Sequence, residues 1–147
     1  MNGTIQILGS QHQEVLARLA EVEANLSQET SAAAADLATF LEDDVLDHFV
    51  LEEEALFPQL ALHIGNDSGP LVVMNAEHAE FRSSLQALAM AVKNGDVTAQ
   101  RQHAEGLIDL LRGHIFKEDH VLFPLALRLL TPEEIQQVDA RAAERHA

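Results

Sequence analysis

Two short segments of the chain place histidine and glutamate at a spacing that can bind metal ions. HFVLEEEALFP begins at His48 and HIFKEDHVLFP begins at His114, so each segment has a Glu four residues after its His and ends in Leu-Phe-Pro. On a helix, residues i and i+4 lie one above the other on the same face. His48 with Glu52, and His114 with Glu118, are therefore each expected to point at a common position.

These segments belong to a longer internal repeat with an offset of 66 residues, the distance from position 48 to position 114. The same offset relates His12 to His78. At about 1.5 Å per residue, the helix geometry brings His12 to roughly the same level as His48 along the helix axis. A half made of two helices cannot bury its apolar face alone, so the two halves are expected to pack together.

The repeat is therefore expected to bring four imidazoles and two carboxylates together in the protein interior. The candidate metal ligands are His12, His48, Glu52, His78, His114 and Glu118. A set of two shared carboxylates and two imidazoles for each of two ions suits iron, manganese or zinc better than calcium or magnesium. Both ions would keep open positions for an external ligand. Without a cation, burying these groups would be costly.

Neighbouring polar residues offer alternatives. Asp119 lies five residues after the last of these histidines and is the alternative to Glu118 as the second bridging carboxylate. Glu53 and Glu54 lie about 100° or more around the helix from the favoured Glu and are expected to face solvent. The histidines without a partner at ligand spacing are expected to be exposed, namely His63, His103, His120 and His146.

The Leu-Phe-Pro tails follow directly on the ligand pairs. Leu56 and Leu122 are expected to lie in the core above the site. On a straight helix Phe57 and Phe123 point away from the metal, whereas a kink at the following Pro would turn them into hydrophobic walls. Both orientations remain open from the sequence alone. Such walls would exclude bulk water and tune whatever binds to the metal.

Apolar residues recur with a period near 3.6, which predicts an all-α protein. The expected helices run from Ser10 to Leu26, from about 31 to 63 with a kink at Pro58, from Pro70 to Asn94 before the Gly95 cap, from Asp96 to about Leu130, and briefly from Thr131 onward. On the second helix the inward-facing candidates are Leu37, Phe40, Leu41, Val45, Leu51 and Leu62.

Short connections between four such helices predict an antiparallel up-and-down four-helix bundle built from two similar helix-turn-helix halves, with a short C-terminal fifth helix. The 147 residues suit one domain, 1–147. The ferritin-like class is excluded because it is built on Glu-x-x-His, and no Glu in this sequence has a His at that spacing.

The amino-acid composition excludes or disfavours several kinds of site and partner. The chain has no cysteine, which excludes disulfides, thiolate zinc sites and iron–sulfur clusters with Cys ligands. A net charge of −15 disfavours nucleic acid and anionic membranes as partners. There is no basic n-region or long apolar run at the N-terminus, so a cytoplasmic protein is expected. Because Tyr and Trp are absent, redox work must stay at the metals or pass to an external electron donor.

The pattern His, His-x-x-x-Glu, His, His-x-x-x-Glu, with Leu-Phe-Pro after each Glu, resembles the hemerythrin-like (HHE cation-binding) domain from His12 to Pro124. The resemblance implies a non-haem centre of two iron ions with an oxo or hydroxo bridge. It also implies four histidines as terminal ligands and two glutamates as bridging ligands, at the positions given above.

Two departures from that family pattern bear on function. Invertebrate oxygen-carrying hemerythrins have a fifth His where this chain has Met74, which disfavours respiratory O2 carriage. Di-iron proteins of iron–sulfur cluster repair usually add an N-terminal segment with cysteines, whereas this sequence has no cysteine. We therefore expect a protein that binds or reacts with O2, peroxide or NO, with a preference for reactive oxygen or nitrogen chemistry, including peroxide decomposition or O2 activation by an enzyme. The alternatives are a reversible O2 or NO binding or sensing module, iron storage, and iron–sulfur cluster repair.

Overall fold

The computed structural model describes residues 3–145, and within this range it contains helices and no strands. The elements are α1 (Thr4–Leu26), α2 (Thr30–Phe40), η1 (Leu41–Val45), α3 (Leu46–Leu51), η2 (Glu52–Leu56), α4 (Phe57–Ile64), α5 (Pro70–Asn94), α6 (Val97–Lys117), η3 (Glu118–Leu122), α7 (Phe123–Leu129) and α8 (Pro132–Arg145), where η marks a π-helical segment. The predicted all-α class is confirmed. Among these residues, no helix is both long enough and apolar enough to cross a bilayer.

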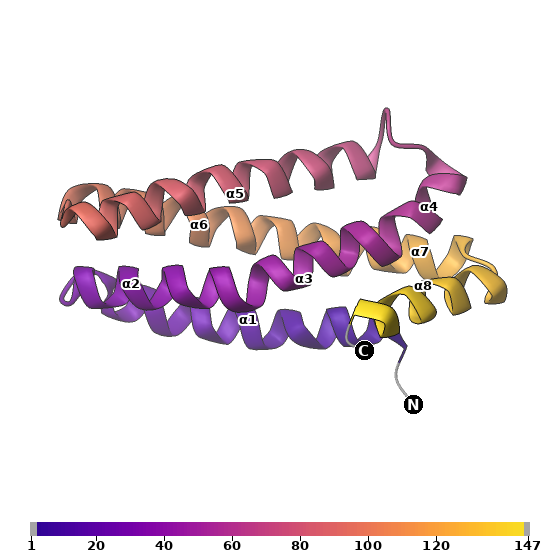
Figure 1. Cartoon of the computed structure of the whole chain (residues 1–147), viewed down its shortest axis with the longest axis horizontal. Helices are drawn as coiled ribbons and strands as arrows, with labels where there is room; N and C mark the ends of the chain where they lie inside the picture. The colour runs from indigo at the N-terminus through magenta and orange to yellow at the C-terminus, as the bar shows by residue number, and fades with distance from the viewer. Residues whose placement is uncertain (1–2, 146–147) are drawn as a thin grey trace.

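Long helical stretches lie side by side along the molecule (Figure 1). The first is α1, the second runs without a break from α2 through α3 to α4, the third is α5, and the fourth runs from α6 to α7. The chain reverses direction after each of the first three stretches (Figure 1). Helix α1 packs on α2, α5 packs on α6, and α8 contacts η2, α1 and α4 at one end.

The apolar core is divided into two clusters along the length of the molecule. One includes Leu19, Leu37, Leu88, Leu107 and Leu111. The other includes Leu8, Leu56, Leu60, Leu71 and Leu122. On α1, Leu8 belongs to the second cluster and Val15 to the first, and the buried His12 lies between them. The predicted ligands therefore occupy the level at which the two apolar clusters meet.

Most predicted helix ends are confirmed. Pro70 is the first residue of α5, and Gly95 ends that helix in the left-handed conformation with φ 66°. The Asp96 side chain accepts a hydrogen bond from the backbone N–H three residues later, at 3.1 Å. Thr131 and Glu134 exchange side-chain and backbone hydrogen bonds of 3.1 and 2.8 Å, which is the capping-box arrangement at the start of α8.

The predicted start of the first helix at Ser10 is wrong, because α1 begins at Thr4. The extra turn buries Ile5 and Leu8 in the second apolar cluster. Its cap comes from a distant part of the chain: the backbone N–H and the hydroxyl of Thr4 both donate to Asp139 Oδ1 of α8, at 2.9 and 2.7 Å. A local capping pattern cannot reveal such a partner.

The inward orientation predicted for Leu62 is also wrong, since its side chain is 72% exposed while Leu60 is fully buried. The reason is η2, a π turn in which the N–H of Phe57 donates to the carbonyl of Glu52, five residues earlier. A π turn contains one residue more than an α turn. The side chains that follow it are therefore rotated about the helix axis relative to a regular α-helix. The irregularity predicted at Pro58 thus takes the form of a π turn immediately before the proline.

Replacing Asp139 should loosen the junction between α1 and α8. Asp139→Ala removes the one oxygen that accepts from both the N–H and the hydroxyl of Thr4. Loss of a helix cap costs about 1 kcal/mol in the free energy of unfolding. Urea denaturation at one fixed metal content measures this loss. Gln137→Ala, at an exposed position of α8, is the control and should change the free energy by less than about 0.5 kcal/mol. Equal stability of the two variants would contradict the cap.

Candidate metal centre

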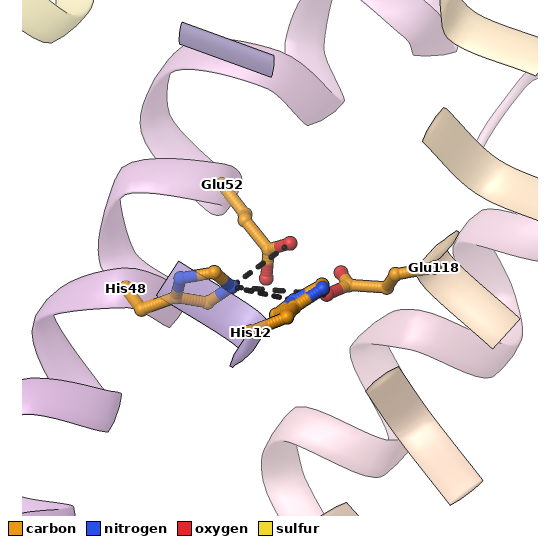
Figure 2. A group of neighbouring side chains, drawn as sticks. All are labelled: His12, His48, Glu52 and Glu118. Atoms are coloured by element: carbon orange, nitrogen blue, oxygen red, sulfur yellow. Dashed lines mark hydrogen bonds and ion pairs between the residues drawn. The ribbon is translucent and has the colours of Figure 1, made fainter. Parts of the chain in front are cut away.

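The structure brings the six predicted ligand residues together in the middle of the protein. They form two overlapping groups, His12, His48, Glu52 and Glu118, and Glu52, His78, His114 and Glu118. In each group, one ligand atom from each residue lies within 4.8 Å of all the others, and every member is buried. Both groups contain the same two glutamates. Figure 2 shows the first group, in which the four side chains point toward one another.

The ligand pairs keep the register expected from their spacing. His48 Nε2 lies 3.5 Å from Glu52 Oε2, and His114 Nε2 lies 3.4 Å from Glu118 Oε2. Each Glu is the first residue of a π segment, η2 or η3. The α-helical i, i+4 relation therefore holds up to the glutamate and changes only after it.

Within each half, the Nε2 atoms of the two histidines face each other. His12 Nε2 faces His48 Nε2 at 3.2 Å, and His78 Nε2 faces His114 Nε2 at the same distance. Each carboxylate also reaches into the opposite half. Glu118 Oε1 lies 2.9 Å from His12 Nε2, and Glu52 Oε1 lies 3.3 Å from His78 Nε2.

Each of the four converging histidines has a hydrogen-bond acceptor at its outer nitrogen, Nδ1. These contacts are His12 with Asp119 at 2.7 Å, His48 with Gln11 at 2.8 Å, His78 with Glu53 at 2.6 Å, and His114 with Glu77 at 2.8 Å. Gln11 and Glu77 were not among the predicted site residues, and Glu53 was expected to face solvent. The signal was present nonetheless, because positions 11 and 77, and positions 53 and 119, obey the same offset of 66 residues.

This hydrogen-bond pattern fits a bound cation. If each Nδ1–H donates outward, each Nε2 presents a lone pair inward, and two lone pairs 3.2 Å apart cannot bond to each other. Both carboxylate oxygens of Glu52, and Glu118 Oε2, are also buried without a hydrogen-bond partner. Acceptors without donors in a protein interior need a positive charge between them. Imidazole and carboxylate together suit iron, manganese and zinc.

The pKa values of the carboxylates move in opposite directions. Burial and the nearby charge of Glu118 raise the pKa of Glu52 well above its ordinary range. Burial acts in the same direction on Glu118, but its close contacts with Glu52, His114 and His12 outweigh it and hold the pKa of Glu118 well below its ordinary range. These shifts favour a proton on Glu52 over one on Glu118.

The imidazoles divide in the same way. Burial lowers the pKa of His48, and burial together with the charge of His114 lowers the pKa of His78 to about 4. For His12 and His114 burial also lowers the pKa, but contacts with Glu118 and the outer carboxylates outweigh it and raise the value. The two histidines with lowered pKa hold a free lone pair at neutral pH.

Aromatic side chains form walls around the imidazoles. Phe123 stacks on His12 at a centroid distance of 5.4 Å, and Phe57 stacks on His78 at 5.5 Å. Phe49 lies against the other face of the site, 3.9 Å from His78. Of the two orientations that the sequence left open for Phe57 and Phe123, the structure thus shows the one in which a helical irregularity turns the rings toward the imidazoles. The leucine before each of them is buried, as predicted.

Other candidates lie outside the cluster. Asp119 faces the outer nitrogen of His12, whereas Glu118 faces Nε2. Glu54 is exposed as predicted and pairs with Arg145 at 3.2 Å. Met74 is buried in the second apolar cluster.

Two of the remaining histidines are exposed as predicted. His63 is exposed and contacts Glu134, and His120 is exposed against Phe116. His103 is half-buried, which corrects the prediction of exposure. His146 lies outside the described residues.

The chain is similar in sequence to several curated proteins. Three curated relatives are the iron-sulfur cluster repair proteins YtfE of Shigella boydii serotype 18, Escherichia coli strain SE11 and Escherichia coli strain 55989. Each is 34% identical to this chain over 100 residues, covering 60% of this chain and 44% of the relative. The chain thus matches less than half the length of these relatives. No solved structure matches it significantly.

The family assignment rests on a match that covers most of the chain. The model of the hemerythrin HHE cation binding domain matches residues 3–126, which include all six converging histidines and glutamates. The chain belongs to the hemerythrin HHE cation-binding domain family.

Proposed function

We propose that the chain holds two iron ions within an antiparallel up-and-down four-helix bundle. Four histidines would act as terminal ligands through Nε2, and two glutamates would bridge the ions. The observation that carries this proposal is the pair of overlapping buried groups that share Glu52 and Glu118. Two ions with two common carboxylates match that overlap, and manganese or zinc are possible substitutes for iron.

Glu118 is the better choice for the second bridge. It belongs to both four-residue groups, and its carboxylate lies between Nε2 atoms of the two halves. Asp119 instead accepts from the outer nitrogen of His12 at 2.7 Å and is 30% exposed in its side chain. Its role in this proposal is to orient His12 rather than to bind a metal ion.

The chain's own residues would do three things for such a centre. The outer acceptors hold each Nδ1–H, which keeps Nε2 free to bind and fixes the plane of each ring. The stacked rings of Phe57 and Phe123, with the buried Leu56 and Leu122, exclude bulk water from the imidazoles. The low polarity of these walls strengthens every electrostatic interaction inside the site.

We further propose that the protein handles reactive oxygen or nitrogen species. When bound, two irons with open positions can take O2, peroxide or NO as a small external ligand and exchange electrons with it. Met74, where oxygen carriers have a fifth His, leaves both halves with two histidines each and favours reaction over storage of the ligand. The chain has neither Tyr nor Trp, so electrons for repeated turnover would come from an external donor.

The main alternative is iron–sulfur cluster repair. The observation in its favour is the identity of 34% with proteins of that name. Against it, the sequence has no cysteine. Reversible binding or sensing of O2 or NO uses the same centre without turnover. Iron storage is disfavoured because two ions per 16.1 kDa chain is a small capacity.

Removing a bridging carboxylate should cost metal. Glu52→Ala and Glu118→Ala should each lower the iron content below two per chain, because each glutamate belongs to both ligand groups. Elemental analysis after desalting measures the content. Glu54→Ala, at an exposed position two residues after the first bridge, is the matched control and should keep both ions.

Asp119→Ala separates the two candidate bridges. It should keep two irons at saturating iron, with affinity weaker by about 10- to 100-fold, since it loses only an outer hydrogen bond. Loss of an ion at saturation would move the bridge from Glu118 to Asp119. Two irons in both Glu→Ala variants would exclude the proposed ligand set.

The reaction class is tested by adding peroxide to the iron-loaded chain and following the visible spectrum together with dissolved O2. A spectral change that decays with catalytic O2 evolution is the expected result. A stable adduct without O2 evolution would favour the reversible binding module. If neither occurs, and the loaded chain instead restores an oxidatively damaged iron–sulfur protein better than free iron does, cluster repair replaces the proposal.

A further inference from the structure

The two metal positions differ in the residues behind their histidines. In the half-site of His12 and His48, the outer acceptors are Asp119 and the neutral amide of Gln11. We call this position A. In the half-site of His78 and His114, which we call position B, the outer acceptors are two carboxylates, described below.

The acceptors at position B are fixed by basic side chains. Glu53 accepts from His78 at 2.6 Å and also from both terminal nitrogens of Arg82, each at 2.8 Å. Glu77 accepts from His114 at 2.8 Å and also pairs with Lys117. The repeat does not reproduce these cations at position A, because the corresponding positions 16 and 51 are both leucine.

Glu77 and Gln11 are equivalent positions of the internal repeat, and here the repeat exchanges a carboxylate for an amide. A carboxylate can only accept, so it forces the proton onto Nδ1 and the lone pair onto Nε2. An amide can rotate and donate instead, which allows His48 to carry its proton on Nε2, where a metal ion would bind. A hydrogen bond to a charged acceptor is also roughly twice as strong as one to a neutral acceptor.

We infer that position B binds its metal ion more tightly than position A, and that the exchange of Gln11 for Glu77 across the repeat sets the order of filling. The inference rests on the proposed two-metal function. A missing outer partner typically changes metal affinity by 10- to 100-fold. The opposing effect is the repulsion of a cation by Arg82 and Lys117, whose side chains are 39% and 46% exposed. Such solvated, paired charges change an equilibrium constant by less than about tenfold.

Solvent contact points the same way. A surface hollow lined by Gln11, His48 and several acidic residues reaches position A. His48 is 5% exposed, the largest value among the four histidines. The position with the weaker outer partner is thus also the one that borders on water, and it should exchange its ion first.

The test is a titration of the metal-free full chain with Zn²⁺, followed by calorimetry in competition with a chelator and by ¹⁵N NMR of the imidazoles. The wild type should take two ions in two steps at least about tenfold apart. The ring signals of His78 and His114 should move in the first step, and those of His12 and His48 in the second.

Two reciprocal variants link the steps to the outer partners. Gln11→Glu should tighten only the weaker step, and Glu77→Gln should weaken only the stronger step, each by about tenfold. Glu80→Gln removes the same charge from an exposed position of α5 that does not touch an imidazole, and it should change neither step. Circular dichroism checks that each variant retains its helix content.

The outcomes separate the inference from the function on which it rests. Two bound ions with both variants unchanged, or with the steps affected in the reverse order, would overturn the inference and leave the two-metal centre in place. If Glu80→Gln changed the binding steps as much as Glu77→Gln does, the loss of negative charge would explain the effect, and the hydrogen bond to the imidazole would not. Failure of the wild type to bind two ions would overturn the proposed function itself.

Discussion

The structure depends on an electrostatic constraint at its centre: two buried carboxylates and four buried imidazoles point their electron pairs at the same small volume. Glu52 and Glu118 are fully buried, and three of their four oxygens have no hydrogen-bond donor. In a medium of low polarity, such a cluster is stable only if positive charge lies within it. Protons can supply part of that charge, as the opposite pKa shifts of the two glutamates indicate, and metal ions can supply more.

The rest of the fold holds this cluster in place. Apolar clusters on both sides fix the helices above and below the histidines. The π segments η2 and η3 begin at the two glutamates, so the α-helical turn between each His and its Glu is followed at once by a π turn. That turn brings a phenylalanine onto an imidazole of the opposite half. Because the whole arrangement is repeated with an offset of 66 residues, two similar half-sites meet, and small differences between them, such as Gln11 against Glu77, can make the ions unequal.

The sequence could predict the helices and the convergence of the six histidines and glutamates because both depend on local spacing and on an exact repeat. It could not predict the start of α1, since the cap of Thr4 comes from Asp139, 135 residues away. Nor could it predict the burial of Leu60 in place of Leu62, because an analysis with a period of 3.6 does not register the extra residue of a π turn. The outer acceptors depend on how helices are rotated against each other, and Glu53 was misjudged for that reason. The internal repeat relates positions 11 and 77, and positions 53 and 119, and therefore carries a signal of these outer acceptors.

Membership of the hemerythrin HHE family indicates a cation-binding site. The number of ions and their positions belong to the proposed two-iron centre. The most direct measurement is an anomalous-scattering map at the iron absorption edge from crystals of the iron-loaded chain. The account predicts two peaks between Glu52 and Glu118, one beside the Nε2 atoms of His12 and His48 and one beside those of His78 and His114. A single peak, or peaks on the outer side of the histidines near Asp119, would contradict it.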